Sequence, residues 1–431
     1  MDLLDPIEWL ALPLRLWRRI CRVPDDLESV TVRGDEVRPR EVGLTRAAVD
    51  RIWQRVEKLY QTGLHPAIQV CVRHRGAVVL DRAIGHASGN APDDPPDAPR
   101  VPVGLDTPFR LYSASKAVTA MVIHKLDDLG VLHVDDRVAD YLPVFRRGAR
   151  RHITIAHVLC HRAGIPALPA GALDLDLLER PERIVELLAA TPLRMRPGRR
   201  LAYHAVTGGF VLGEVVRAAT GEDVRSVLRK EIREPLRLRW LDYGVAADDV
   251  EKVARDALTG LGPPPGLAQL FERALGAPVE RVIEIAHDPR FLSSIVPAAN
   301  VVSNARDLCT FFECLRAEGQ LDGVQVFEPR TIRRATSEQS YWEADFTLVI
   351  PVRYGLGFML GGEHFSLFGP GTPHAFGHLG FTNVLGWADP ERQLAAAILT
   401  SGKPFADVEV LRLYQVLVEI ARELPRERSG W

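Results

Sequence analysis

The sequence predicts an α+β fold in which an antiparallel sheet flanked by helices carries an inserted, mostly helical lobe. Strand-like apolar runs occur near both ends of the chain, whereas the region from about 170 to 300 follows helical periodicity. Strands at both ends with helices between them indicate one sheet built from both terminal parts. The runs that we interpret as strands are 67–72, 77–84, 353–360, 383–388 and 393–401.

The length of 431 residues favours more than one lobe, because a single core rarely grows so large. We expect an N-terminal amphipathic segment and linker at 1–44 and the first part of an α/β lobe at 45–135. A mostly helical lobe should follow at 136–300, and the second part of the α/β lobe at 301–431. The net charge of −2 gives no electrostatic case for nucleic-acid binding.

The first 23 residues are apolar but resemble neither a signal peptide nor a membrane span. Asp2 and Asp5 occupy the region that is basic in signal peptides, and Pro13 and several arginines interrupt the apolar run. An amphipathic helix fits better, packed on the protein's own body or in peripheral contact with a membrane. We therefore expect a cytoplasmic protein, with membrane association as the alternative. The oligomeric state stays open.

The elements before the first motif follow from periodicity and turn signals. An apolar stripe predicts a helix over 44–60 with Thr45 as its N-cap. The runs 67–72 and 77–84 should form a hairpin, and the six prolines of 91–108 predict an exposed loop. Further helices are expected at 154–160, 174–188, 208–220, 224–232, 304–318 and 407–424. The five cysteines form no C-x-x-C pair, so we expect buried free thiols in a reducing compartment.

Ser113 and Lys116 form an S-x-x-K pair directly before a run with helical periodicity, which places the pair in the first turn of a helix. Residues three apart share a helix face, so the Lys116 amine can reach the Ser113 hydroxyl. A serine hydroxyl becomes a strong nucleophile only when a neighbouring base takes its proton. The alternative is a surface lysine beside a capping serine. With only six lysines in the chain, a chance pair is uncommon.

Two further stretches carry candidate groups. Tyr203 precedes a predicted helix in a loop that we expect to be exposed, and a nearby ammonium should lower its pKa and make it a general base. His378 lies between glycines at a strand edge and could hydrogen-bond the substrate or Tyr203. The backbone N–H near Phe381 is a candidate oxyanion donor, together with that of Ser113. Taken singly, a tyrosine or a histidine in such a position is more often a structural residue, so neither Tyr203 nor His378 carries the assignment alone.

In combination, S-x-x-K at 113–116, Tyr203 and the His378-Leu379-Gly380 stretch resemble the serine β-lactamase and penicillin-binding-protein superfamily. The likeness is to its class C-related esterase branch and covers about residues 45–425. Supporting stretches are 159–164, which is similar to an L-x-H-x-[ST]-G segment, Pro197-Gly198, 203–210 and 298–308. The resemblance implies an acyl-enzyme on Ser113 and an active site in the cleft between lobes.

The chain departs from that pattern at three positions, two of which bear on the substrate. Ala163 replaces a hydroxyl residue, and Ala205 stands where the family usually has the Asn of Tyr-x-Asn. His378 stands in place of the Lys of Lys-Thr-Gly. The resemblance implies that the Asn and the Lys of the family pattern contact the amide and the carboxylate of β-lactams and peptides. Their absence from this chain therefore favours neutral esters of short to medium acyl chains.

Several other functions are compatible with the same motifs as a carboxylesterase or lipase. An acyltransferase using the same acyl-enzyme, a β-lactamase or D-Ala-D-Ala peptidase, and a non-catalytic binding module remain alternatives. No G-x-S-x-G occurs, which argues against an α/β-hydrolase. His157 and His161 have a spacing that suits zinc, but the sequence offers no clear third ligand. We therefore predict no cofactor, no metal and no nucleic-acid partner, with a small-molecule ester as substrate.

Overall fold

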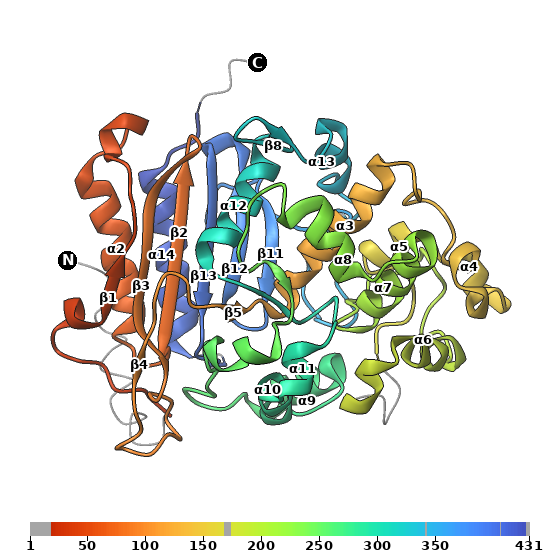
Figure 1. Cartoon of the computed structure of the whole chain (residues 1–431), viewed down its shortest axis with the longest axis horizontal. Helices are drawn as coiled ribbons and strands as arrows, with labels where there is room; N and C mark the ends of the chain where they lie inside the picture. The colour runs from red at the N-terminus through yellow and green to blue at the C-terminus, as the bar shows by residue number, and fades with distance from the viewer. Residues whose placement is uncertain (1–18, 168–173, 341–342, 406, 428–431) are drawn as a thin grey trace.

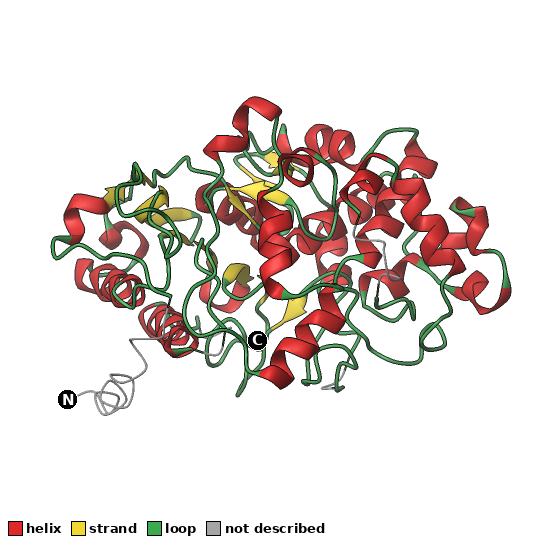
Figure 2. Cartoon of the chain, turned by 90° about the horizontal axis from the view of Figure 1, so that it is seen from below, coloured by secondary structure: helices red, strands yellow, loops and turns green. Residues whose placement is uncertain are grey.

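The computed structural model describes residues 19–167, 174–340, 343–405 and 407–427. The predicted α+β architecture is confirmed: an antiparallel sheet with helices on its faces adjoins a region of helices (Figure 1). Viewed from below, the strands lie toward one end of the long axis and the other end is helix and loop (Figure 2). The predicted N-terminal amphipathic helix falls mostly on 1–18, which lie outside the described residues.

The main sheet joins strands from both ends of the chain, as the sequence predicts. Within the described residues its eight strands run in the order β1-β3-β2-β13-β12-β11-β10, with β4 paired to β3. All neighbouring pairs are antiparallel. The bounds are β1 Thr31–Arg33, β2 Ala67–His74, β3 Ala77–Ser88, β4 Val101–Pro102, β10 Met359–Leu360, β11 Phe376–Gly380, β12 Val384–Asp389 and β13 Leu394–Thr400.

Short strands outside this sheet form two smaller ones. A three-stranded sheet in the order β5-β7-β6 carries the chain into the first motif, and β8 pairs with β9. Their bounds are β5 Phe109–Arg110, β6 Asp242–Tyr243, β7 Val301–Ser303, β8 Gln320–Leu321 and β9 Val324–Gln325.

Within the described residues the α-helices carry the labels α2 to α14. Their bounds are α2 Arg46–Tyr60, α3 Ser115–Asp128, α4 Val138–Tyr141, α5 Ile155–Leu159, α6 Pro181–Ala190, α7 Thr207–Thr220, α8 Val224–Leu228, α9 Pro265–Leu275, α10 Val279–His287, α11 Pro289–Ser293, α12 Ala305–Arg316, α13 Pro329–Ala335 and α14 Val408–Glu423. As predicted, Thr45 caps α2 and its hydroxyl accepts from the Ala48 N–H.

The sheet separates two apolar cores because successive side chains of a strand point to opposite faces. On one face, Val70 of β2 packs in a cluster with Trp53 of α2 and Val416 of α14. On the other face, Cys71 belongs to the larger cluster that contains Phe311 of α12. Figure 1 shows α12 in front of the sheet and α14 behind it. The five cysteines are free and buried, as expected.

Three sequence predictions need correction. Only Met359–Leu360 of the predicted strand 353–360 joins a ladder, since Gly357 turns the chain with a φ of 104°. The helix predicted over 174–188 divides at Pro181, which begins α6 after a 3-10 helix at Leu175–Glu179, because proline cannot sit inside a helix without loss of a hydrogen bond. The helix predicted over 224–232 ends as α8 at Leu228 and continues as a π-helix.

No helix within the described ranges is long and apolar enough to cross a membrane.

Candidate active site

Ser113 lies in a 3-10 turn at Tyr112–Ala114 immediately before α3, not in the first turn of the α-helix as predicted. The turn is held by the small sheet, where the Leu111 N–H donates to the Val301 carbonyl at 2.8 Å. The second serine of the motif, Ser115, is buried and accepts the Val301 N–H at 3.0 Å. Ser113 is partly exposed and is therefore the more accessible hydroxyl of the pair, whereas Ser115 anchors the turn.

Among the described residues, the Lys116 amine contacts three oxygens and no carboxylate. Its Nζ lies 3.0 Å from the Ser113 Oγ, 2.7 Å from the Ala205 carbonyl and 3.1 Å from the Ala298 carbonyl. Burial lowers the pKa of Lys116 to about 7. A neutral amine donates two hydrogen bonds and keeps one lone pair. The two carbonyls can take both donors, so the lone pair faces the Ser113 hydroxyl.

Tyr203 lies beside this pair but does not have the predicted electronic state. Its phenol is hydrogen-bonded to Ser113, and the Lys116 Nζ lies 4.9 Å from the centroid of its ring. Burial raises the pKa of Tyr203, with only partial opposition from the Ser113 contact. The predicted pKa decrease is wrong, because the loop is buried and Lys116 sits over the ring face. Tyr203 is thus a phenol and not a phenolate at neutral pH.

His378 lies on β11 with its ring centroid 6.5 Å from that of Tyr203. Burial lowers the pKa of His378 to about 3, so the ring is neutral. Its Nδ1 lies 2.8 Å from the Leu379 carbonyl and must donate to it, which leaves Nε2 with its lone pair. His378 therefore carries no fixed positive charge, and its ring is hydrogen-bonded to the Leu379 carbonyl and not to Tyr203.

Two further histidines lie at the site, although the sequence offers His161 only as a candidate zinc ligand and gives no role to His204. His161 packs on Tyr203 with ring centroids 4.7 Å apart, and its Nδ1 accepts the His204 N–H at 3.2 Å. Burial lowers the pKa of His161 well below its ordinary value and that of His204 to about 3. His161 falls in the 159–164 stretch, so that family resemblance was the available signal. These neutral rings surround the amine without adding charge.

Phe381 follows β11 and shares a cavity with Ser113. Its backbone φ is 47°, and its ring stacks on Tyr112, whose φ is 48°, with centroids 5.1 Å apart. The close approach of the two segments depends on Gly380, where a Cβ would overlap the Leu111 carbonyl oxygen. The structure thus brings together all five predicted residues, Ser113, Lys116, Tyr203, His378 and Phe381, at one place.

An apolar cavity of about 100 Å³ opens beside Ser113. Besides Tyr112, Ser113 and Phe381, it is lined by Asp174, Leu175, Leu178, Ala205, Val206, Phe210, Leu275, Ala277, Val282, Ile285, Ala286, Phe291, Val296 and Ala299. Asp174 is the one acidic or basic side chain among the described residues that line it. Such a lining suits a hydrocarbon chain, and the Ala205 methyl contributes to it where an amide would not.

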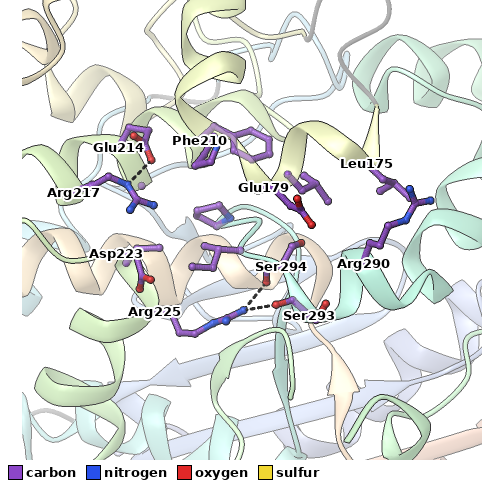
Figure 3. Close-up of a pocket in the computed structure, with 16 residues that line it drawn as sticks. Leu175, Glu179, Phe210, Glu214, Arg217, Asp223, Arg225, Arg290, Ser293 and Ser294 are labelled. Carbon is purple, nitrogen blue, oxygen red and sulfur yellow. Dashed lines mark hydrogen bonds and ion pairs between the residues drawn. The ribbon is translucent and has the colours of Figure 1, made fainter. Parts of the chain in front are cut away.

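A second, larger cavity of about 340 Å³ adjoins the apolar one. The two share Leu175, Leu178 and Phe210 in their linings. Figure 3 shows polar side chains around it, with Arg217 directed to Glu214 and Arg225 to the carbonyls of Ser293 and Ser294. None of the five predicted site residues is among the described residues that line it, so its size does not make it the reaction centre.

His157, half of the pair with zinc-like spacing, is used as a helix cap. Its Nδ1 accepts the Thr154 N–H at 3.2 Å, while Thr154 Oγ1 accepts the His157 N–H. Across the part of the chain that the structure describes, no three metal-ligating side chains lie together.

Comparisons with known proteins agree with this geometry. Residues 53–419 match the family model described as Beta-lactamase. The chain is 30% identical over 310 residues to Esterase/beta-lactamase LipL of Mycobacterium tuberculosis, covering 69% of this chain and 70% of LipL. It is 28% identical over 283 residues to Esterase EstB of Burkholderia gladioli, covering 61% and 68%.

A solved structure shows the same architecture. The crystal structure of a penicillin-binding protein homologue from Caulobacter crescentus superposes with a TM-score of 0.76 at 27% identity. The alignment covers 89% of this chain and 99% of that one.

Proposed function

The chain belongs to the beta-lactamase family, and from this premise we propose that it is a serine hydrolase that cleaves carboxylic esters through an acyl-enzyme on Ser113. The observation that carries the proposal is the Lys116 amine, 3.0 Å from the Ser113 hydroxyl with two carbonyls as its other partners. An uncharged amine in that position is a base that needs no further activation.

In the proposed acylation, Ser113 Oγ attacks the ester carbonyl carbon while its proton passes to the Lys116 Nζ. The N–H groups of Ser113 and Phe381 stabilise the carbonyl oxygen as it becomes an oxyanion. The Tyr203 phenol, which keeps its proton at neutral pH, donates it to the departing alkoxide and is reprotonated from Lys116. In the second half of the reaction, water attacks the acyl carbon, the same groups transfer the protons in the reverse direction, and the acid is released.

Ester substrates fit the site better than charged amides. The apolar cavity beside Ser113 accepts an acyl chain, and the Ala205 methyl belongs to that cavity. The neutral His378 offers no fixed cation to a substrate carboxylate. LipL and EstB, two relatives of this chain, are both named esterases. These observations support a carboxylesterase. Because LipL is named both an esterase and a β-lactamase, β-lactams are the competing substrate class.

The proposal is tested with Ser113→Ala and Tyr203→Phe on p-nitrophenyl butyrate. Ser113→Ala should abolish turnover and labelling by a fluorophosphonate, with the melting temperature retained. Tyr203→Phe should lower kcat by about 100-fold or more, as loss of a general acid does. Turnover by Ser113→Ala comparable to the unsubstituted protein would reject the nucleophile. Faster p-nitrophenol release with added alcohol, and accumulation of the transesterified product, would instead identify an acyltransferase.

A further inference from the structure

A cluster of buried charges lies behind the nucleophile and takes no part in the chemistry described above. Asp256, Arg110 and Lys403 are each less than 5% exposed. The Arg110 Nε donates to Asp256 Oδ2 at 2.6 Å, and the Lys403 Nζ lies 3.3 Å from Asp256 Oδ1. Although burial opposes ionisation, the guanidinium and the ammonium hold the pKa of Asp256 below its ordinary value. Asp256 is therefore a fixed negative charge.

This carboxylate reaches the turn of the nucleophile through one side chain. The Tyr112 hydroxyl donates to Asp256 Oδ2 at 2.6 Å, and the Lys403 Nζ lies over the Tyr112 ring, 5.1 Å from its centroid. Tyr112 immediately precedes Ser113, so the peptide group that carries the Ser113 N–H is shared between these two residues. Any rotation of the Tyr112 backbone turns that N–H.

Tyr112 and Phe381 are both in the left-handed backbone region, which is costly for residues other than glycine. Their φ values are 48° and 47°. Such a conformation is strained for a residue with a side chain and persists only where the surroundings hold it. The two rings stack at 5.1 Å with an interplanar angle of 21°. Each strained residue thus supports the other, and each one sets the direction of one proposed oxyanion donor.

The turn that follows Phe381 is tied to the strand preceding Lys403. Asn383 donates from Nδ2 to the Gly402 carbonyl at 3.1 Å, and the Thr400 hydroxyl lies 2.5 Å from Asn383 Oδ1. Lys403 in turn donates to the Thr400 carbonyl at 2.6 Å. Both oxyanion segments are therefore connected to the same pair of buried charges, Asp256 and Lys403.

We propose that Asp256 is a positioning residue, which acts through the Tyr112 hydroxyl to hold the stacked pair Tyr112–Phe381 so that the Ser113 and Phe381 N–H groups face the substrate carbonyl oxygen. This proposal rests on the function proposed above. It assigns to the aromatic residue before the nucleophile a role in stabilising the transition state, beyond packing in the core.

The test compares two tyrosine-to-phenylalanine variants that each lose one hydrogen bond to an aspartate. Tyr112→Phe removes the 2.6 Å bond to Asp256, and Tyr141→Phe removes a 2.6 Å bond to Asp136 on a different part of the molecule. In Tyr112→Phe, we expect kcat for p-nitrophenyl butyrate to fall by about 10- to 100-fold, with little change in KM. This loss is smaller than the about 100- to 1000-fold loss on removal of an oxyanion donor, because the donor is displaced and not removed. Tyr141→Phe should keep the kcat of the unsubstituted protein.

A second readout separates positioning from loss of folded protein. Each rate is divided by the concentration of Ser113 sites titrated with a fluorophosphonate, and the affinity for an alkyl boronic acid is measured, because its tetrahedral adduct occupies the oxyanion site. Tyr112→Phe should bind the boronic acid more weakly by about the same factor by which kcat/KM falls.

A rate per titrated site within twofold of the unsubstituted protein would overturn the proposal, as would a kcat loss with unchanged boronic acid affinity. Either result would leave the proposed esterase intact as long as Ser113→Ala is inactive. Activity in Ser113→Ala would instead remove the premise.

Discussion

The Lys116 side chain is partly buried and has no carboxylate partner among the residues that the structure describes, and its environment sets the pH dependence of the reaction. Burial lowers the pKa of Lys116 to about 7, and only the neutral amine can take the Ser113 proton. From that pKa, about one tenth of the molecules are active at pH 6 and about nine tenths at pH 8. We expect kcat/KM to rise through this range and then level off. Burial lowers the pKa of His204 and His378 to about 3 and raises the pKa of Tyr203, so none of these three groups changes its charge between pH 6 and pH 8.

Substitution of Lys116 tests whether this lysine, and no other, accounts for the pH dependence. Lys116→Arg should lower kcat by about 100-fold or more and abolish the rise with pH, because a guanidinium does not deprotonate in proteins. Lys125→Arg is the matched control, since Lys125 lies on the same helix and its Nζ donates to the Val326 carbonyl. A rise through pH 7 that survives in Lys116→Arg would show that another group titrates.

Substrate selectivity also belongs to single residues. We expect kcat/KM for p-nitrophenyl butyrate to lie far above that for nitrocefin, because Ala205 and the neutral His378 leave the amide and carboxylate of a β-lactam without partners. An unpaired buried polar group costs about 1–3 kcal/mol. Ala205→Asn should narrow the ratio of the two values, whereas Ala205→Leu, of similar shape but without the amide, should not. Efficient nitrocefin hydrolysis by the unsubstituted protein would contradict this interpretation.

At the scale of elements, β11 must pass very close to the nucleophile turn. A Cβ on Gly380 would overlap the Leu111 carbonyl oxygen, and neither backbone can yield without moving Ser113 or Phe381. Gly380→Ala should therefore lower kcat by about 10- to 100-fold, the effect of a small displacement of catalytic groups. Gly262→Ala provides the control, because a Cβ there has no neighbour within 4 Å. Full activity in Gly380→Ala would show that this contact does not position the site.

The elements divide into those that local sequence specifies and those that tertiary contacts specify. The α2 helix with its Thr45 cap and the β2–β3 hairpin could be predicted, because periodicity and turn residues agree there. The segment 353–360 could not, since its apolar residues resemble a strand while Gly357 directs the chain against Ala120. The 3-10 geometry at Ser113 depends on β7, which lies 186 residues further along the chain from Ser115.

The same division holds for the site when the whole molecule is considered. The five predicted residues could be found because S-x-x-K and the two later stretches carry a family pattern. The pKa of Tyr203 could not be predicted, because it depends on burial and on Lys116 lying over the ring and not beside the hydroxyl. Asp256 and Lys403 have no local motif, and only the folded chain brings them to Tyr112.

The apolar cavity beside Ser113 combines the nucleophile turn with helices from the middle of the chain. Leu178, on the 3-10 helix at Leu175–Glu179, lines both this cavity and the larger one of Figure 3. Of these two cavities, Val282 of α10 lines the apolar one and is not among the described residues that line the larger one. Both side chains are partly buried, so their truncation should cost less than the about 2–5 kcal/mol of a fully buried leucine.

If the acyl chain occupies this cavity, removal of the shared wall should extend it. We expect Leu178→Ala to shift the preferred p-nitrophenyl ester toward longer acyl chains, because the truncated side chain opens the cavity toward the space of about 340 Å³ behind it. Val282→Ala enlarges the cavity without opening that wall, so its preferred chain length should stay close to that of the unsubstituted protein. The measurement is kcat/KM for esters from acetate to palmitate, with melting temperatures for both variants. Identical chain-length profiles for Leu178→Ala and Val282→Ala would place the acyl chain elsewhere.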